Sequence, residues 1–137
     1  MCIKRIKVIY LLQVNKKKPY TYFNKKGIYN HMNRVKKIVH CDGIWKGKDS
    51  VVVVMDTGVA KHPELEGRIW VFRDFVNGHF IEYDDNGHGT HVCGIIGGSQ
   101  IGISPECKII VLKVLDERGN GSVEQRMRAF RWILENQ

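Results

Sequence analysis

The first 40 residues contain no aspartate or glutamate, although they hold 11 of the chain's 22 lysine and arginine residues. Residues 41–137 carry all 14 acidic residues and the other 11 basic ones, so the net charge of +8 comes from the N-terminal part. Because runs of like charge are usually solvated, we interpret residues 1–37 as a basic, partly disordered N-terminal extension. No RNA-binding signature accompanies the charge, which argues against a nucleic acid partner. No apolar run approaches the ~20 residues of a transmembrane helix, so no membrane partner is predicted.

Cysteine motifs are also missing. The four cysteines form neither a CxxC pair nor a zinc-type spacing, and the N-terminal apolar stretch lacks the cleavage site of a signal peptide. Free thiols without an export signal favour a reducing compartment. The sequence therefore predicts a cytoplasmic protein, with a secreted protein as the alternative if the true N-terminus is missing.

Apolar patterning after residue 38 indicates strands that alternate with helices. Val51–Met55 is a continuous β-branched run, which is typical of a strand covered on both faces. Further strands are predicted over residues 68–75 and 109–115, and a helix over residues 88–97. This alternation predicts an α/β fold with a parallel sheet and crossover helices, which we assign to one domain over residues 38–137.

A second helix is predicted from Ser122 onward. Ser122 is followed three residues later by Gln125, the spacing of a capping box. Four apolar residues line one face of this helix at helical spacing: Met127, Phe130, Ile133 and Leu134.

Two short motifs carry the chemistry. Asp56-Thr57-Gly58 ends the first predicted strand, and His88-Gly89-Thr90-His91 begins the first predicted helix. Catalytic groups gather at the carboxyl ends of parallel strands. An aspartate that accepts a hydrogen bond from Nδ1 of a histidine leaves Nε2 free to take a proton from a serine. The pairing of Asp56 with His88 is therefore a candidate for two members of a Ser-His-Asp triad.

Other interpretations of these motifs fit less well. Asp-Thr-Gly is also an ordinary turn and occurs in aspartic proteases, but the histidine motif and the α/β pattern have no place in that class. His88 and His91 could bind a metal together with Asp56, yet the HExxH spacing of zinc proteases is absent. No metal site is predicted.

The two motifs, in this order, resemble those of the subtilisin-like serine proteases (subtilases). The resemblance covers residues 38–137 and is closest to the intracellular bacterial members. It implies a subtilisin-like fold and serine endopeptidase activity, in which Asp56 orients the base and His88, the first histidine of its motif, is the base. His91, one helical turn further on, is expected to pack and form hydrogen bonds inside the protein. The nucleophilic serine should follow on the order of 150 residues after the histidine. The chain would then be the N-terminal portion of the catalytic domain, incomplete on its C-terminal side and inactive alone.

The resemblance also implies how substrate binds. A peptide or protein substrate would lie in an extended conformation along a strand edge, through main-chain hydrogen bonds and side-chain pockets. The residues implied for this edge are Leu115, Gly119, Asn120 and Gly121. The other implied partner is the missing C-terminal half of the catalytic domain. A catalytically inactive truncated protein or an interaction protein is the alternative.

Calcium is considered because Glu64 matches a position that some subtilases use for this ion. The loop that would supply most other ligands is short here, between Gly98 and Gly102. Calcium takes six to eight oxygen ligands, so no cofactor is predicted. Asp84 and Asp85 are interpreted as solvated loop residues or part of a local turn. The alternative is that they tune the pKa of His88 or border the substrate cleft.

Overall fold

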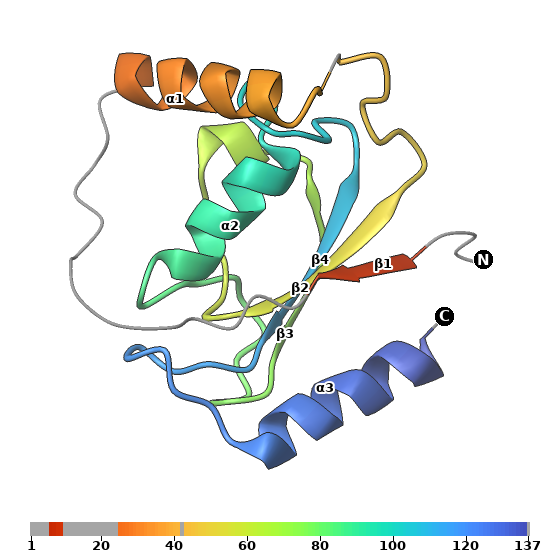
Figure 1. The fold of residues 1–137 in the computed structure, drawn as a ribbon. Helices are drawn as coiled ribbons and strands as arrows, with labels where there is room; N and C mark the ends of the chain where they lie inside the picture. The colour runs from red at the N-terminus through yellow and green to blue at the C-terminus, as the bar shows by residue number, and fades with distance from the viewer. Residues whose placement is uncertain (1–5, 10–24, 42, 137) are drawn as a thin grey trace.

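The protein contains a four-stranded, entirely parallel sheet. The computed structural model describes residues 6–9, 25–41 and 43–136. The strands are β1 (Ile6–Ile9), β2 (Val51–Asp56), β3 (Ile69–Asp74) and β4 (Lys108–Lys113), and they lie in the order β1-β2-β4-β3 (Figure 1). The prediction of an α/β fold built on a parallel sheet is confirmed.

Helices cover both faces of this sheet. The helices are α1 (Lys25–Ile38), α2 (His88–Gly97) and α3 (Val123–Glu135), with a 3-10 turn at η1 (Pro63–Leu65). Figure 1 shows α2 and α3 on opposite sides of the sheet. α1 lies near the C-terminal end of α2, where Lys36 Nζ donates to the Gln100 carbonyl oxygen at 3.5 Å. In the described part of the chain, no helix has both the length and the apolar character needed to cross a membrane.

The valine run explains how β2 is covered on both faces of the sheet. Val52 and Val54 belong to the core cluster on the α2 side, whereas Val51, Val53 and Met55 belong to the cluster on the α3 side. Successive side chains of a strand point to opposite faces, and every residue of β2 is buried. A strand covered on both faces needs apolar residues at each position, and this run supplies them up to Asp56.

The apolar face predicted for α3 is only partly buried. Ile133 is buried, at 7% exposure, but Met127, Phe130 and Leu134 are 58%, 39% and 71% exposed. The helix instead turns Ala129 and Ile133 toward the sheet, with Trp132 packed beside them, because the small Ala129 lets the helix approach closely. The capping box is confirmed: the backbone N–H of Gln125 donates to Ser122 Oγ, and Gln125 Oε1 accepts from the Ser122 N–H.

The predicted strand over residues 109–115 ends two residues early. β4 stops at Lys113, and the backbone N–H groups of Val114 and Leu115 both donate to the carbonyl oxygen of Asp56, at 2.9 and 3.3 Å. The chain therefore turns across the end of β2 instead of continuing the ladder.

The basic N-terminal region contains more structure than expected. β1 pairs in parallel with β2, in the register Ile6 to Val51, and α1 buries Met32 to 4% exposure. Residues 6–9 and 25–38 therefore form regular structure, while residues 10–24 lie outside the described residues, so the expectation of a partly disordered extension stays a prediction. The predicted boundary after residue 37 falls inside α1 and not between two secondary-structure elements. The division into regions 1–37 and 38–137 stays a prediction.

Candidate active site

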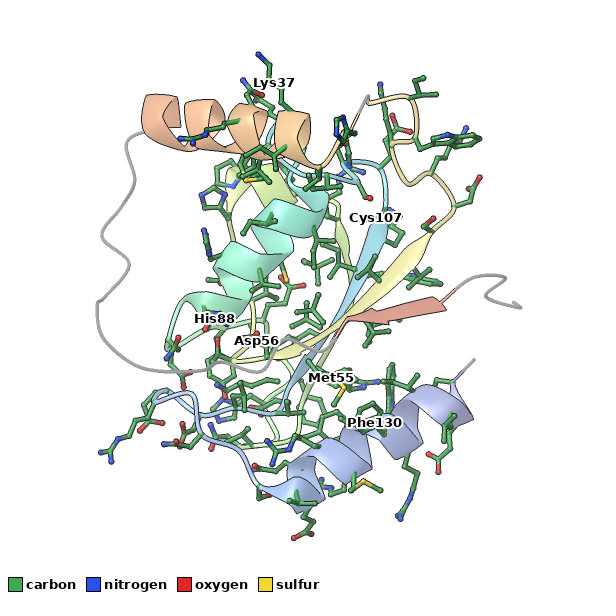
Figure 2. All side chains as sticks on the ribbon, viewed as in Figure 1. Lys37, Met55, Asp56, His88, Cys107 and Phe130 are labelled. Atoms are coloured by element: carbon green, nitrogen blue, oxygen red, sulfur yellow. The ribbon has the colours of Figure 1, made fainter. Side chains whose placement is uncertain are left out.

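Asp56 and His88 lie against each other at the carboxyl end of β2. Nδ1 of His88 is 2.8 Å from Asp56 Oδ1 and 3.0 Å from Oδ2. The Asp56 side chain is 1% exposed and that of His88 is 15% exposed. Since a carboxylate only accepts hydrogen bonds, Nδ1 carries the proton, and a neutral imidazole then has an unprotonated Nε2. Figure 2 shows the two side chains side by side where α2 begins.

Two glycines allow this close meeting of strand and helix. Gly58 has a φ of 127°, in the region that side chains disfavour, and a Cβ on Gly89 would lie 2.2 Å from the Gly58 carbonyl oxygen. The N–H of Gly89 donates to Thr57 Oγ1 at 2.9 Å. The first turn of α2 therefore rests directly on the turn that follows Asp56, which sets the distance between the two candidate residues.

Asp84 links the turn after Asp56 to the start of α2, a role that was not predicted from the sequence. Its carboxylate accepts hydrogen bonds from Thr57 Oγ1 at 2.9 Å, from the N–H of Gly87 at 2.9 Å, and from the N–H and Oγ1 of Thr90 at 2.8 and 2.6 Å. Burial raises the pKa of Asp84, but these hydrogen bonds outweigh it and the pKa lies below its ordinary value. The ionised Asp84 side chain thus joins the end of β2 to the start of α2 by hydrogen bonds, and it is not a solvated loop residue.

The expectation that His91 packs inside the protein is wrong. His91 is exposed on α2, whereas Gly89, Val92 and Cys93 form the buried face of that helix. The sequence analysis chose the first histidine of the motif, and the structure places that histidine, His88, beside Asp56.

The region implied for substrate binding adjoins the candidate pair. Asn86 Nδ2 donates to the carbonyl oxygen of Glu117 at 2.9 Å, which joins the loop before His88 to the segment after β4. In that segment, the Asp116 N–H donates to the Asn120 carbonyl oxygen at 2.7 Å, so Asn120 closes a turn. Leu115 is 7% exposed and packs in the α3-side core. The substrate-binding roles of Leu115, Gly119, Asn120 and Gly121 stay predictions.

A tyrosine with a displaced pKa lies beside the site. Burial, followed by the hydrogen bond from the Tyr83 hydroxyl to Asp74 at 2.6 Å, raises the pKa of Tyr83 to about 12. The same aspartate accepts from the N–H groups of Val76 and Asn77. These contacts hold the loop that leads from β3 towards Asp84.

The donor set around Glu64 does not fit calcium. Glu64 Oε2 accepts from the N–H groups of Gln100 and Ile101 at 2.8 and 3.4 Å, and from Ser99 Oγ at 3.3 Å. Backbone N–H groups cannot ligate a cation, and calcium needs several oxygens. Within residues 6–9, 25–41 and 43–136, no group of three or more His, Cys, Asp or Glu side chains is placed to hold a metal.

Comparison with known proteins identifies the family of the chain. The Subtilase family profile matches residues 47–137. Serine protease AprX of Bacillus subtilis is 37% identical over 110 residues, which cover 75% of this chain and 25% of AprX. An intracellular serine protease of Paenibacillus polymyxa is 30% identical over 130 residues, covering 85% of this chain and 40% of the relative.

A solved structure shares both sequence and fold. The crystal structure of a cold adapted subtilisin-like serine proteinase superposes with a TM-score of 0.64 at 37% identity, over 68% of this chain and 34% of that protein. The chain spans about a quarter of the length of the first curated relatives it matches. The profile match, the sequence identities and the shared fold agree, and the chain belongs to the subtilase family.

Proposed function

We propose that the protein is a serine-type endopeptidase in which Asp56 and His88 are two members of an Asp-His-Ser triad. The observation that carries this proposal is the contact of His88 Nδ1 with both carboxylate oxygens of Asp56, at 2.8 and 3.0 Å, at the end of a buried parallel strand. Family membership supports it. The nucleophilic serine and the oxyanion-hole asparagine would come from a part of the protein outside residues 1–137.

The proposed chemistry follows from the geometry of the pair. As the serine Oγ attacks the scissile carbonyl, Nε2 of His88 takes the hydroxyl proton and later gives it to the leaving amine. Asp56 stays ionised, holds Nδ1–H, and stabilises the imidazolium that forms. Asp56 is held in turn by the Thr57 N–H, which donates to Oδ1 at 2.7 Å.

The substrate would be a peptide or protein segment in an extended conformation, bound along the segment that contains Leu115 and residues 119–121. The remainder of the catalytic domain would pack on α3. This second proposal is supported by an apolar stripe on that helix whose members are more than a third exposed: Val123, Met127, Phe130 and Leu134. Phe130 is labelled in Figure 2.

The free state of Cys41, Cys93 and Cys107 supports a reducing, cytoplasmic location. Cys93 is fully buried, and burial followed by the charges of Asp56 and Asp84 raises its pKa far above the ordinary value. It is therefore an inert thiol and not a second nucleophile. Fractionation of cells from culture medium, with a secreted and a cytoplasmic marker, would test the location.

The activity is tested on the protein expressed from its complete reading frame. We expect casein hydrolysis and labelling by a fluorophosphonate probe, with His88→Ala lowering kcat by about 10⁶-fold and Asp56→Asn by about 10⁴-fold. His91→Ala is the matched control, because His91 is exposed on the same helix. The 137-residue chain alone should show neither hydrolysis nor labelling.

Three results would contradict the proposal. Hydrolysis that survives His88→Ala would mean that another base acts. Loss of activity in His91→Ala would mean that the two histidines have been assigned the wrong way round. A folded but inert product of the complete reading frame would favour the alternative of a non-catalytic protein.

A further inference from the structure

Lys113 is fully buried at the end of β4, next to the candidate catalytic pair. Its exposure is 0%, and in the sheet it lies opposite Asp56 of β2 and Asp74 of β3. Lysine is almost never fully buried unless it is paired, because removing an ammonium from water costs several kcal/mol. In the sequence Lys113 only interrupts an apolar strand, so its burial calls for an explanation.

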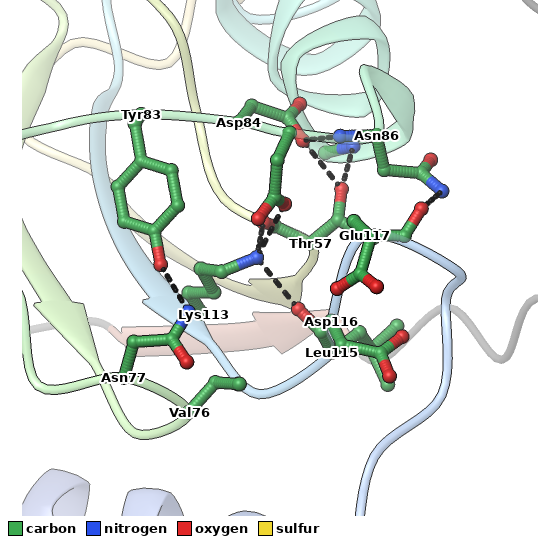
Figure 3. Close-up of polar contacts among 12 residues, drawn as sticks. Thr57, Val76, Asn77, Tyr83, Asp84, Asn86, Lys113, Leu115, Asp116 and Glu117 are labelled. Carbon is green, nitrogen blue, oxygen red and sulfur yellow. Dashed lines mark hydrogen bonds and ion pairs between the residues drawn. The ribbon is translucent and has the colours of Figure 1, made fainter.

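The ammonium group has a complete set of partners. Nζ lies 2.7 Å from the Thr57 carbonyl oxygen, 2.7 Å from Asp85 Oδ1 and 2.8 Å from the Leu115 carbonyl oxygen. An ammonium has three N–H donors, and each has one acceptor here. Nζ also lies 5.0 Å from the ring centroid of Tyr83, within the range of a cation–π contact. Figure 3 shows Lys113 reaching between the labelled Thr57 and Leu115.

The three oxygens belong to three separate segments of the site. Thr57 follows Asp56 directly, and Asp85 precedes His88 by three residues. Leu115 begins the segment implied for substrate binding. One side chain thus joins the segment of the candidate acid, the loop of the candidate base and the substrate segment.

We propose that Lys113 is a positioning residue that fixes the catalytic pair and the substrate-binding segment in one arrangement. This inference rests on the proposed endopeptidase function. Lys113 acts through backbone carbonyls and Asp85, and takes no part in proton transfer itself.

Stability alone does not account for this arrangement. A buried ion pair is a weak stabiliser, and well-packed apolar residues of similar size often serve as well. The apolar side chains of β4 show that this strand can be buried without charge: Ile109, Ile110, Val111 and Leu112. What an apolar side chain cannot do is donate to three oxygens on three segments, and leaving these acceptors unpaired would let the segments move apart.

The test compares Lys113→Met with Lys108→Met in the protein expressed from its complete reading frame. Both changes replace an ammonium of the same strand by a chain of similar length. Lys108, however, is exposed, and within the described part of the chain its Nζ donates a hydrogen bond only to the Gly67 carbonyl oxygen, at 3.1 Å. We expect Lys113→Met to lower kcat/KM by about 10- to 100-fold well below its melting temperature, and Lys108→Met to leave it within about twofold.

A second readout does not depend on hydrolysis. The Nδ1–H proton of His88 gives a downfield NMR signal while it is held by Asp56, and Lys113→Met should shift or broaden it. Asp85→Asn keeps an acceptor oxygen near Nζ but removes its charge, so its effect should be smaller and in the same direction. If Lys113→Met does not fold, Asp85→Asn decides by the same two readouts.

The inference is overturned if the folded Lys113→Met protein, or Asp85→Asn in its place, keeps kcat/KM within about twofold and an unchanged His88 signal. Such a result would leave Lys113 a purely structural residue. If the wild-type protein hydrolyses nothing, the proposed function fails. The His88 signal still decides separately whether Lys113 positions the pair.

Discussion

The contact between Gly89 and Gly58 should decide whether Asp56 and His88 can meet. A Cβ placed on Gly89 would lie 2.2 Å from the Gly58 carbonyl oxygen, whereas real Cβ atoms essentially never come within 3.0 Å of another atom. Gly89→Ala must therefore move the start of α2 away from the turn by at least 0.8 Å, the difference between these two distances. Both partners are backbone or backbone-attached, so no flexible side chain can give way instead.

This displacement is large compared with the tolerance of a hydrogen bond. The bond from His88 Nδ1 to Asp56 Oδ1 is 2.8 Å long. If the helix moved along that direction, the distance would grow to about 3.6 Å, beyond the upper limit of roughly 3.2 Å for N–H···O bonds. A misplacement of about 1 Å can cost about 10²-fold in rate. Overpacking should also lower the free energy of unfolding by about 1–3 kcal/mol.

Gly94→Ala is the matched control, because Gly94 lies in the same helix and is also buried. A Cβ there would meet only Ile101 Cδ1, at an ordinary 3.9 Å. Alanine is the better helix former by about 1 kcal/mol, so Gly94→Ala should leave activity unchanged and stability unchanged or slightly higher. Hydrolysis rate and urea denaturation are measured for both variants of the complete protein. Equal hydrolysis by the two would refute the reasoning that this close approach sets the geometry of the pair.

Three further outcomes are expected. Hydrogen bonds outweigh burial and lower the pKa of Asp84 in the folded protein. The ionised form of Asp84 therefore stabilises the fold at pH values above its unfolded pKa of about 3.9. This contribution is lost as the pH falls through the lower pKa of the folded state. The melting temperature should therefore drop below about pH 4, and Asp84→Asn should be less stable at pH 7 with a flatter acid limb. Burial and the bond to Asp74 raise the pKa of Tyr83 to about 12, so Tyr83 should ionise near pH 12 in an ultraviolet titration, and Tyr83→Phe should remove that step. The contribution of Tyr83 to stability is complete below about pH 10 and is lost as the pH rises towards 12. In urea denaturation of the 137-residue chain, Ile133→Ala should cost about 2–5 kcal/mol and Leu134→Ala less than about 0.5 kcal/mol, because only Ile133 is buried; equal costs would mean that α3 packs on a different face.

The features that the sequence predicted are those controlled by neighbours along the chain. Val51–Met55 needed only its continuous apolar character to be recognised as a doubly covered strand, and Ser122 needed only Gln125 to mark the start of α3. Asp56 could be paired with the His88–His91 motif because a strand end and a helix start at one edge of a parallel sheet come together. The choice of His88 over His91 came from the resemblance to the subtilases.

The features that the sequence analysis missed depend on contacts between distant segments. Asp84 and Asp85 are adjacent acids with the same local signal, yet one accepts from Thr57 and Thr90 while the other pairs with Lys113. Composition cannot separate them, because the difference lies in which donors the fold brings near. The basic character of residues 1–40 likewise gave no sign that β1 would pair with β2.

The buried polar groups of the site explain how the Asp56–His88 pair holds its geometry. Asp56 is held by Thr57 and His88, Asp84 by the donors at the start of α2, and Lys113 by oxygens on three segments. Each of these charges is satisfied within residues 56–115, so the arrangement of the pair depends on contacts inside this range. Changes at Gly89, Asp84 or Lys113 should therefore disturb the His88 signal in a folded protein whether or not hydrolysis can be measured.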